Sequence, residues 1–430
     1  DTRMKHRILI LGSGGREHAI AHSLSKSPRC EALFVAPGNA GTAEVAQNIE
    51  LSVSDFLAVE GACVKQAISL VVVGPEVPLV EGIVDYFKKT PSLSSVLIVG
   101  PDQLAAQLEG SKDFAKAFMS KYGVRTAAYA TFTRETLFEG MRFLEGLTPP
   151  YVLKADGLAA GKGVLILDDL DQAKTKLNAF LSEDLFGEAG SKVVIEEFLD
   201  GIECSCFVAV DAKHQYQILP MAKDYKRIGE QDTGPNTGGM GAVSPVSFID
   251  EELYARIEEE IVVPTVKGVQ TENYSYVGFV FIGLMIVQGV PYVIEYNVRM
   301  GDPETEVVFP RIQSDTVDLL EAMCLGTLER HKLSVRKEVA TTVIAVSEGY
   351  PDAYEKGKVV YGLTRAHESH VYHAGTALKD GSVVTNGGRV LAITSFGDRM
   401  EQALGKSYAT LEQVGFEQMY FRRDIGKDLM

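Results

Sequence analysis

Residues 151–167 read Tyr-Val-Leu-Lys-Ala-Asp-Gly-Leu-Ala-Ala-Gly-Lys-Gly-Val-Leu-Ile-Leu, and this stretch decides the fold. Two apolar, β-prone runs, 151–153 and 164–167, flank a loop of glycine and alanine. Lys154 follows the first run, and Lys162 lies inside the loop. Glycines let backbone N–H groups come close to an anion, and a lysine adds a point charge. The stretch therefore predicts a hairpin that folds over the phosphates of a nucleotide.

The spacing of this stretch excludes a P-loop. That motif places four residues between its first glycine and Gly-Lys-Ser/Thr, and a helix follows it. Here Gly157 and Gly161 are three residues apart, Gly163 follows Lys162, and the next run is strand-like. The alternative to a phosphate-binding hairpin is a Gly/Ala-rich hairpin with an exposed lysine.

The composition is that of an ordinary globular protein, with 430 residues, 46% hydrophobic and 23% charged. A chain of this length predicts about two to four domains. The formal net charge of −16 argues against a nucleic acid held through its phosphates. No apolar run approaches the roughly 20 residues of a membrane span, and no signal peptide is visible, so we expect no membrane partner. Residues 1–3 read as a cloning scar before a native Met4.

The cysteines predict a reducing compartment. There are five, an odd number, and the only close pair is Cys204 and Cys206 in a strand-like run. Neither a zinc spacing nor a disulfide framework is present. We therefore expect buried free thiols and a cytoplasmic protein.

The first hundred residues predict a parallel sheet. Apolar runs at 7–12, 33–36, 70–73 and 96–99 alternate with helical patterns, and each run ends in a turn with glycine. Parallel strands bring such turns to one edge, where these folds bind ligands.

The first of these turns, 12–18, predicts a phosphate ester at a helix N-terminus, with Arg16 adding charge. The alternative is a tight strand-to-helix turn. A nicotinamide dinucleotide is disfavoured, because Glu17 stands where the dinucleotide fingerprint needs its third glycine.

Two long helices are predicted from apolar spacing, over 103–121 with Lys112 inside it, and over 250–270 with Asp250 as N-cap. The polar, glycine-rich stretch 223–241 is predicted to form no regular element. Between and after these lie the other expected strands and one short helix: strands at 193–199, 204–210, 215–221, 276–287 and 292–296, and a helix at 171–181.

A metal site is predicted at the end of the last of these strands. Glu295 and Asn297 alternate with apolar neighbours, so both side chains face one side of the strand. Two oxygen ligands suit Mg²⁺, which takes further ligands from water and substrate phosphates. The alternative is a surface strand end.

The last hundred residues predict a β-rich region closed by a helix at about 399–414. The turns at 379–381 and 386–388 have hairpin chemistry. The expected strands lie at 340–346, 359–363, 371–374, 383–384 and 390–394.

Six motifs in this order resemble the phosphoribosylamine–glycine ligases, also called glycinamide ribonucleotide synthetases, of the ATP-grasp superfamily. The motifs are Gly-Ser-Gly-Gly-Arg-Glu-His-Ala (12–19), Ala-Pro-Gly-Asn-Ala-Gly-Thr (36–42), Val-Gly-Pro-Glu (73–76), Lys-Ala-Asp-Gly-Leu-Ala-Ala-Gly-Lys-Gly (154–163), Asp-Thr-Gly-Pro-Asn-Thr-Gly-Gly-Met-Gly (232–241) and His-Ala-Gly-Thr (373–376). The resemblance extends from about residue 7 to residue 426.

The resemblance implies a mixed α/β and α+β fold of three domains. These are an N-terminal parallel-sheet domain at 4–105, an ATP-grasp domain at 106–330 with a hairpin-bearing lid at about 122–190, and a β-rich C-terminal domain at 331–430. It also implies ligation of glycine to 5-phosphoribosylamine with ATP and Mg²⁺ or Mn²⁺, through glycyl phosphate, in purine biosynthesis, by a monomer. Alternatives are a sister ATP-grasp ligase, an ATP-binding regulatory protein without turnover, and a nicotinamide oxidoreductase, which Glu17 disfavours.

The resemblance further implies residue roles. ATP would contact Lys112, Lys154, Gly157, Gly161, Lys162, Gly163, Glu196, Glu197, Phe198, Leu199 and Glu203. The other substrates would contact Gly14, Gly15, Arg16, Glu17, His18, Asn39, Gly41, Pro75, Glu76, Arg227, Pro235, Asn236, Thr237, Gly238 and Gly239. Catalytic roles fall to Arg299, Asp302, Asp224 and Lys226, and the metal ligands are Glu295 and Asn297.

Two departures from the family pattern stand out. Many ATP-grasp enzymes carry a second acidic metal ligand on the preceding strand, but residues 281–285 contain no acid. Tyr225 and Met300 stand where the family is expected to have His and Phe. The tyrosine brings an acid/base role at 225 into question, and the methionine is expected to affect packing alone.

Overall fold

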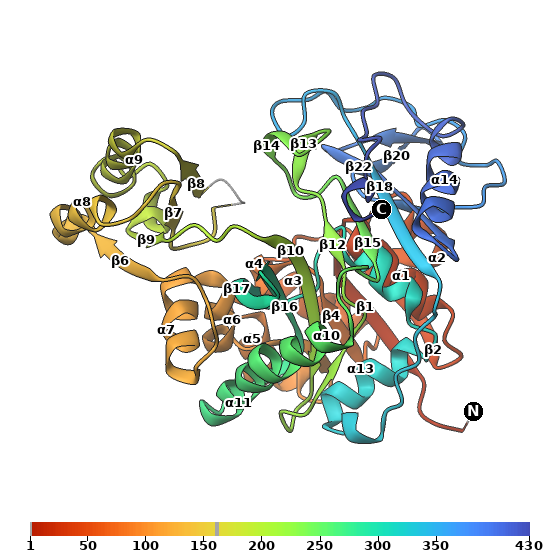
Figure 1. The fold of residues 1–430 in the computed structure, drawn as a ribbon. Helices are drawn as coiled ribbons and strands as arrows, with labels where there is room; N and C mark the ends of the chain where they lie inside the picture. The colour runs from red at the N-terminus through yellow and green to blue at the C-terminus, as the bar shows by residue number, and fades with distance from the viewer. Residues whose placement is uncertain (1, 160–162) are drawn as a thin grey trace.

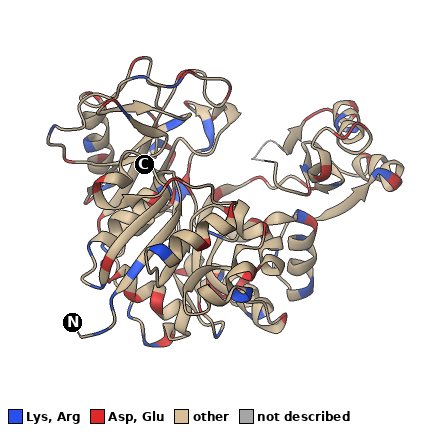
Figure 2. Ribbon diagram, turned by 180° about the vertical axis from the view of Figure 1, so that it is seen from behind, with Lys and Arg blue, Asp and Glu red and all other residues tan. Residues whose placement is uncertain are grey.

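The computed structural model describes residues 2–159 and 163–430. Figure 1 shows a main body, a small lobe that stands away from it and carries α8 (Leu137–Glu145) and α9 (Leu170–Ser182), and a C-terminal region packed on the body. In Figure 2, acidic and basic residues are interspersed over all three parts. In the described part of the chain, no helix has both the length and the apolar character needed to cross a bilayer.

The N-terminal strands form the predicted parallel sheet. Each of β1 (His6–Gly12), β2 (Cys30–Pro37), β4 (Leu70–Val73) and β5 (Leu97–Pro101) pairs in parallel with a neighbour, in the order β5-β4-β1-β2. The short β3 (Gln47–Asn48) extends this edge. The strands are continuously apolar because helices cover both faces, among them α1 (Gly15–Ser25), α3 (Phe56–Lys65) and α5 (Ile83–Lys89).

This sheet continues into the strands of the next region. Residues Tyr276 and Val277 of β16 (Tyr276–Val287) pair antiparallel with the end of β5. Strands β10 (Ile202–Val210), β11 (Tyr216–Ile218) and β17 (Val290–Asn297) complete it. The three were predicted as strands, but their place in this sheet was not predicted. A shared sheet fixes the two regions against each other, and the boundary between them at 105 and 106 stays a prediction.

The predicted helix at 103–121 is wrong as a single element. It is two helices, α6 (Gln103–Gly110) and α7 (Lys112–Tyr122), because Ser111 is extended and its hydroxyl accepts from the N–H of Phe114 as an N-cap. The second long helix is confirmed. It consists of α10 (Glu251–Ile257) and α11 (Val263–Thr271), which a π-helical segment at Glu258–Val262 joins without a break. Asp250 caps it as predicted, accepting from the N–H of Leu253 at 2.8 Å.

The lobe contains the predicted hairpin. β7 (Tyr151–Ala155) pairs with β8 (Val164–Leu167), and the sheet order is β6-β9-β7-β8 with β6 (Tyr129–Thr133) and β9 (Lys192–Glu196). Its inner face buries Leu153 and Ile195 against α8 and α9, where Phe180 of α9 joins the same cluster.

The C-terminal region is β-rich, as predicted. Its main sheet has the order β12-β15-β18-β22-β19, made of β12 (Lys223–Asp224), β15 (Gly241–Ser244), β18 (Val339–Val346), β22 (Arg389–Gly397) and β19 (His370–His373). Helix α14 (Met400–Leu411) packs on it. A separate hairpin joins β20 (Thr376–Lys379) to β21 (Ser382–Thr385) through the predicted turn, in which Asp380 and Gly381 have positive φ.

Three predictions for irregular segments are wrong. Stretch 223–241 holds a hairpin, β13 (Arg227–Gly229) with β14 (Thr233–Asn236), because residues 231, 232 and 234 adopt the positive φ of a turn. The expected strand at 359–363 is reduced to two isolated bridges, since Gly362 has a φ of +86°. The turn at 386–388 joins β21 to β22, which do not pair with each other.

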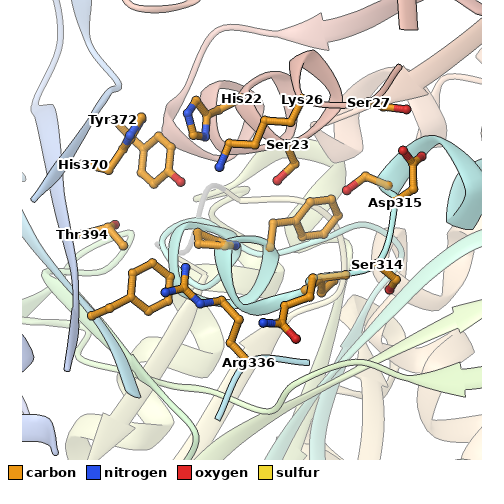
Figure 3. Close-up of a pocket in the computed structure, with 16 residues that line it drawn as sticks. His22, Ser23, Lys26, Ser27, Ser314, Asp315, Arg336, His370, Tyr372 and Thr394 are labelled. Carbon is orange, nitrogen blue, oxygen red and sulfur yellow. The ribbon is translucent and has the colours of Figure 1, made fainter. Parts of the chain in front are cut away.

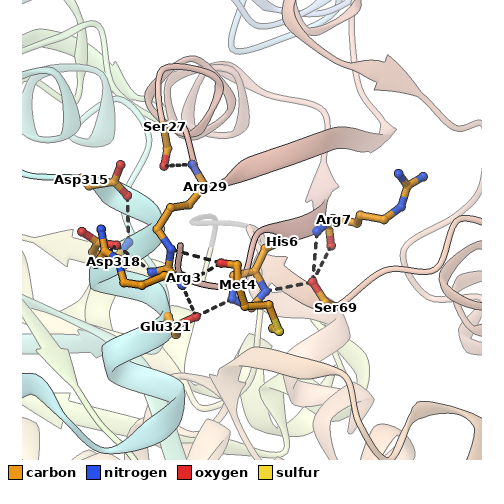
Figure 4. A network of polar contacts seen from close by, with 10 residues as sticks. All are labelled: Arg3, Met4, His6, Arg7, Ser27, Arg29, Ser69, Asp315, Asp318 and Glu321. Carbon is orange, nitrogen blue, oxygen red and sulfur yellow. Dashed lines mark hydrogen bonds and ion pairs between the residues drawn. The ribbon is translucent and has the colours of Figure 1, made fainter. Parts of the chain in front are cut away.

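A buried ionic network holds the first strand to α13 (Thr316–Leu325), as Figure 4 shows. The Arg29 guanidinium, 2% exposed, lies 2.7 Å from Asp318 and 2.6 Å from Glu321. His6 Nε2 lies 2.7 Å from the same Glu321. A buried cation with two carboxylate partners is costly to break, so this network fixes α13 under the N-terminal sheet. All five cysteines are free, as expected, but only three are buried, and Cys30 and Cys324 are partly exposed.

Candidate active site

The turn between β1 and α1 is built around the Glu17 carboxylate. Glu17 Oε1 accepts from the N–H of Gly14 at 2.8 Å. A Cβ at Gly12 or Gly74 would come within 2.5 Å of the Glu17 side chain, so glycine is required at both positions. Glu17 therefore orders the loop that was expected to bind a phosphate ester.

Arg16 joins this turn to the segment after β17. Its Nε lies 2.5 Å from Glu17 Oε2, Nη1 donates to the Met300 carbonyl, and its backbone N–H donates to Asp302 Oδ2 at 3.1 Å. Burial raises the pKa of Asp302, but the charges of Arg389 and Arg16 outweigh it and lower that pKa to about 2. Asp302 is thus an anion held by two cations.

The C-terminal region closes over the same turn. The His373 N–H donates to His18 Nδ1 at 2.7 Å, and the Asn39 amide donates to the carbonyls of Ser13 and His373 at 2.9 Å. A Cβ at Gly41 would lie 2.5 Å from both imidazoles. Asn39, Gly41 and His18 were predicted to share one site, and the structure brings them together.

Arg299 lies between two carboxylates. Its Nε is 3.3 Å from Glu76, at the start of α4 (Glu76–Val80) behind Pro75, and its Nη2 is 3.0 Å from Glu109. Glu109 also accepts from the N–H of Val298 at 2.9 Å. Burial raises the pKa of Glu76, yet the positive charge of Arg299 leaves it lowered.

Glu295 stands among cations from several elements. A bulge in β17 sets Glu295 opposite Gly283 and Asn297 opposite Phe281, so the two predicted metal ligands share a face. Burial raises the pKa of Glu295, but the charges of Lys226, Lys154, Lys112 and Arg299 lower it overall. In the described residues, no hydrogen bond or ion pair holds this carboxylate.

These two residues fit a divalent cation that is shared with a nucleotide. Asn297 is 6% exposed, and its Nδ2 has no hydrogen-bond partner. Gly283 stands where a second acid on β16 would face Glu295. Across residues 2–159 and 163–430, no three His, Cys, Asp or Glu side chains are grouped to hold a metal. A cation here would take its other ligands from phosphates and water.

A buried carboxylate bridges two lysines at the base of the lobe. Glu196 Oε1 lies 2.6 Å from Lys116 Nζ, and Oε2 lies 2.6 Å from Lys154 Nζ. Lys116 also donates to Thr126 at 2.6 Å. The two positive charges lower the pKa of Glu196 despite its burial. Lys154 was predicted to contact ATP, whereas Lys116 was missed, although it is one helical turn after Lys112.

Asp156 fastens the hairpin to the start of α7. Its carboxylate accepts from Ser111 Oγ at 3.0 Å and from the N–H of Asp113 at 2.8 Å, and its carbonyl accepts from the N–H of Lys112 at 3.0 Å. Burial lowers the pKa of Lys112. Asp156 was quoted within a motif but given no role.

The remaining predicted nucleotide contacts lie around the lobe. Glu197 Oε1 accepts from the N–H of Ala128, Phe198 is exposed and Leu199 is half-buried. Gly157 donates to the Ala189 carbonyl, and Gly163 is buried against Ala155. Glu203 lies 3.7 Å from Lys226. Gly161 and Lys162 lie outside the described residues.

Asp224, Lys226 and Glu304 form a charged group beside Glu295. Burial raises the pKa of Asp224, and the Asp224 carboxylate raises that of Lys226. Burial and the charge of Asp224 raise the pKa of Glu304 to about 8. A Cβ at Gly301 would lie 2.0 Å from Glu304 Oε2, so the glycine makes room for this side chain.

The other predicted site residues of stretch 223–241 lie in two different environments. Thr237 donates to the Lys226 carbonyl, and Gly238 and Gly239 pack against Arg389. Arg227, Pro235 and Asn236 are exposed on the β13–β14 hairpin, where Arg227 Nε donates to the Asp232 carbonyl. In the described structure, the side chains of these three make no hydrogen bond or ion pair with another predicted site residue.

The two residues that depart from the family pattern are Tyr225 and Met300. Neither side chain faces the group of Asp224, Lys226 and Glu304. The Tyr225 hydroxyl donates to Asp428 at 2.5 Å, near the end of the chain, and burial raises its pKa. Met300 is 2% exposed and packs in the core.

Most of the buried polar side-chain atoms without a hydrogen-bond partner lie at or beside the predicted site. Within the described residues, the buried side-chain atoms without a hydrogen-bond partner belong to Asn297, Glu304, Glu306 and Thr341, and to two residues that form ion pairs instead, Arg299 with Glu76 and Glu196 with Lys154. Buried polar groups are normally paired. All but Thr341 are at or beside the predicted site, so the site suits polar and charged ligands.

Three family models match consecutive parts of the chain. They are the N domain of phosphoribosylglycinamide synthetase at residues 6–109, its ATP-grasp (A) domain at 110–305 and its C domain at 340–428. The chain belongs to the phosphoribosylglycinamide synthetase family.

Relatives across this family cover nearly the whole chain. The phosphoribosylamine–glycine ligase of Vibrio parahaemolyticus is 44% identical over 98% of this chain and 97% of its own. That of Caldanaerobacter subterraneus is 42% identical over 97% of this chain and 99% of its own. The crystal structure of the Thermotoga maritima phosphoribosylamine–glycine ligase has 40% identity and a TM-score of 0.83, over 97% of this chain and 99% of that one.

A more distant likeness concerns the fold alone. The biotin carboxylase domain of Hydrogenobacter thermophilus 2-oxoglutarate carboxylase, solved with MgADP, has 15% identity and a TM-score of 0.75, over 97% of this chain and 92% of that one. The predicted family, three-part ATP-grasp fold and enzyme class, an ADP-forming ligase, are confirmed. A phosphoribosylglycinamide synthetase of this fold uses ATP and a divalent cation.

Sequence reasoning missed several residues of this family site. Glu109 and Arg389 reach it from α6 and β22, far along the chain from the motifs they contact, and no local signal marks them. Glu304 and Glu306 follow Asp302 directly, so the Asp-Pro-Glu-Thr-Glu run could have drawn attention to them.

Proposed function

We propose that this chain joins glycine to 5-phosphoribosylamine, converting ATP to ADP and phosphate and forming glycinamide ribonucleotide in purine biosynthesis. The names of relatives more than 40% identical over almost the full chain support these substrates. The observation that carries the proposal is Glu295, a carboxylate whose pKa is lowered by three lysines and one arginine from separate elements. That arrangement suits a triphosphate and a cation together.

The residue roles follow the family pattern. Lys112 and Lys154 neutralise the ATP phosphates, and the hairpin covers them. Residues 196–199 hold adenine, and Glu203 holds ribose. Glu295 and Asn297 hold Mg²⁺ or Mn²⁺, which supplies positive charge to the phosphates when bound.

The acceptor sites are assigned in the same way. The 14–18 turn with Asn39, Gly41, Pro75 and Glu76 binds phosphoribosylamine. Glycine and the acyl phosphate lie near Asp224, Lys226, Arg299 and Asp302, with Arg227 and residues 235–239 completing that side.

The chemistry needs no covalent enzyme intermediate. A glycine carboxylate oxygen attacks the γ-phosphorus, the bond to ADP breaks, and glycyl phosphate forms. The amine nitrogen of phosphoribosylamine then attacks the acyl carbon, phosphate leaves with the bonding pair, and the nitrogen loses a proton. The rate enhancement comes from positioning of the substrates, neutralisation of charge and exclusion of water.

We also propose a cytoplasmic monomer that acts on small molecules, without a nucleic-acid or membrane partner. The net charge of −16 and the five free cysteines support this setting. The domain boundaries 4–105, 106–330 and 331–430 are part of the same proposal.

The test is phosphate release from MgATP with glycine, with and without phosphoribosylamine generated in place. Release should require both substrates and yield one glycinamide ribonucleotide per phosphate. Replacing Glu295 by Gln should lower kcat by about a hundredfold or more, because the cation loses its only carboxylate from this pair. Glu252→Gln, an exposed carboxylate in the first turn of α10, is the matched control.

Two outcomes would contradict the proposal. Phosphate release that does not depend on glycine would indicate a sister ligase with another acceptor. Tight ATP binding without any release would indicate a regulatory protein.

A further inference from the structure

A cavity of about 290 Å³ lies between the N-terminal and C-terminal regions. The end of α1, the segment from Phe309 to Thr316 and strands β19 and β22 line it, as Figure 3 shows. Along α1, Lys26 is eleven residues from Gly15, which corresponds to about 16 Å at 1.5 Å per residue. The cavity is therefore separate from the turn at the start of α1.

Three hydrogen-bond donors of this cavity come from three different segments. The Lys26 amine has no ion pair or hydrogen bond in the described residues. Tyr372 is 2% exposed, and its hydroxyl has no hydrogen-bond partner there either. Arg336 Nη2 lies 2.7 Å from Glu338, and the guanidinium stacks 3.8 Å from the Phe396 ring centre, so its position at the wall is fixed.

The one acidic side chain of the lining is already engaged. Asp315 accepts from the N–H of Asp318 at 2.9 Å and caps α13. In Figure 3, Asp315 lies on the side of the cavity opposite Tyr372, while the Lys26 amine and the Arg336 guanidinium are on the Tyr372 side. Of the two cationic donors, Lys26 therefore has no carboxylate beside it in the described part of the chain, whereas Arg336 shares its charge with Glu338.

The wall next to these donors is made of aromatic rings in tilted contact with one another. The His22 and His370 rings are 4.1 Å apart, and the His370 and Tyr372 rings are 4.2 Å apart. Burial lowers the pKa of His22 to about 4 and that of His370 to about 3, so both imidazoles are neutral near pH 7. Neutral aromatic rings offer an apolar surface against which a ring-bearing ligand can pack.

We propose that this cavity binds a small phosphate monoester carried on a ring, of the sugar phosphate or nucleoside monophosphate class. A phosphate dianion has three oxygens for the Lys26, Arg336 and Tyr372 donors, and charge-assisted bonds of this kind are strong. The volume is at the lower end for small-molecule sites, which suits such a ligand.

The test is calorimetric titration of the full chain with adenosine 5′-monophosphate, ribose 5-phosphate and inorganic phosphate. MgADP is kept saturating, so that the nucleotide site of the proposed reaction is occupied. Loss of binding in a Lys26 variant distinguishes the cavity from the proposed phosphoribosylamine site, of which Lys26 is not a part. Lys26→Gln should weaken monoester binding at least tenfold, and Tyr372→Phe, which keeps the ring, about threefold to tenfold. Lys65→Gln, in the last turn of α3, should leave binding unchanged.

The outcomes decide the proposal. Tighter binding of the nucleotide than of the sugar phosphate would support stacking on the ring wall, and equal binding would support a sugar phosphate. Monoester binding unchanged in Lys26→Gln, binding of inorganic phosphate alone, or no binding at about 10 mM would overturn it. Lys26 is exposed and its replacement should not affect folding, so this variant carries the test if Tyr372→Phe is unstable.

Discussion

At the scale of single residues, the most informative contact is Glu196 between Lys116 and Lys154. Both lysine amines lie 2.6 Å from the carboxylate, and all three side chains are almost fully buried. In the proposed reaction, Lys154 has to leave this pair, at least in part, to meet a phosphate. Lys116 keeps Glu196 compensated while that happens, because a buried carboxylate without a partner is strongly unfavourable.

Replacing Lys116 by Met should therefore raise the KM for ATP about tenfold and change kcat less. Glu196 would hold its one remaining lysine more tightly, so phosphates would compete with the carboxylate for Lys154. Steady-state kinetics against ATP measure this, and Lys116→Arg should restore most of the affinity. Lys121→Met, an exposed lysine on the same helix, is the control. An unchanged KM for ATP in Lys116→Met would refute the argument.

Single residues of this site were predictable where a motif contains them. The local sequence pattern indicates the chemistry at Lys154, Asn39 and Glu295. Two other residues could not be predicted, Arg389 and Glu109. They become neighbours of Asp302 and Arg299 only when distant segments pack together. A sequence pattern carries no signal for such contacts.

At the scale of elements, the lobe is fastened to the body through Asp156. The same residue binds the N–H groups of Lys112 and Asp113 and follows Lys154 by two positions. It thus sets the spacing between the two lysines proposed to hold the ATP phosphates, one on α7 and one on β7.

Asp156→Ala should raise the KM for ATP about tenfold, because the two lysines lose their fixed spacing. Asp169 is a matched control, since it caps α9 in the same lobe by accepting from the N–H of Gln172 at 2.9 Å. Either substitution removes one helix cap and should cost about 1 kcal/mol in stability. Chemical denaturation and ATP kinetics on both variants separate the two effects. Equal KM values for the two would show that Asp156 acts as a cap alone.

Elements were predicted best where hydrophobic period and turn chemistry agree. The hairpin at 151–167 and the N-terminal strands follow from apolar runs between glycine turns. The break at Ser111 was missed, since the apolar spacing continues through it and only the cap hydrogen bond reveals it. The β13–β14 hairpin was missed because its strands are polar and exposed.

At the scale of the whole molecule, the N-terminal and C-terminal regions meet through histidines. His18 and His22 on α1 make edge-on and tilted ring contacts with His370, His373 and Tyr372 of β19. Burial lowers the pKa of all four histidines, to about 4 for His22 and His373 and to about 3 for His370. The contact between the two regions therefore depends on neutral imidazoles.

A histidine with a lowered pKa in the folded state stabilises the protein fully above its unfolded pKa of about 6.5. Below that pH, the unfolded chain binds the proton and the folded chain does not, so the contribution falls as the pH approaches 4. Glu304 and Glu306 act in the opposite sense, because burial raises the pKa of each. The free energy of unfolding of the whole protein therefore contains contributions that rise with pH and contributions that fall with pH. Only a comparison between wild type and a histidine variant separates the contribution of the histidines.

His370→Asn should destabilise the chain at pH 7, where the stacked, neutral ring contributes fully. Between pH 7 and pH 5 the difference from wild type should narrow by roughly tenfold in the unfolding equilibrium constant, because only the wild type loses the contribution of His370. Urea unfolding at several pH values measures it. His367→Asn serves as control, since His367 lies outside the cluster and contacts the Gly362 carbonyl. A difference that stays constant from pH 7 to pH 5 would mean that His370 stabilises the interface by packing alone.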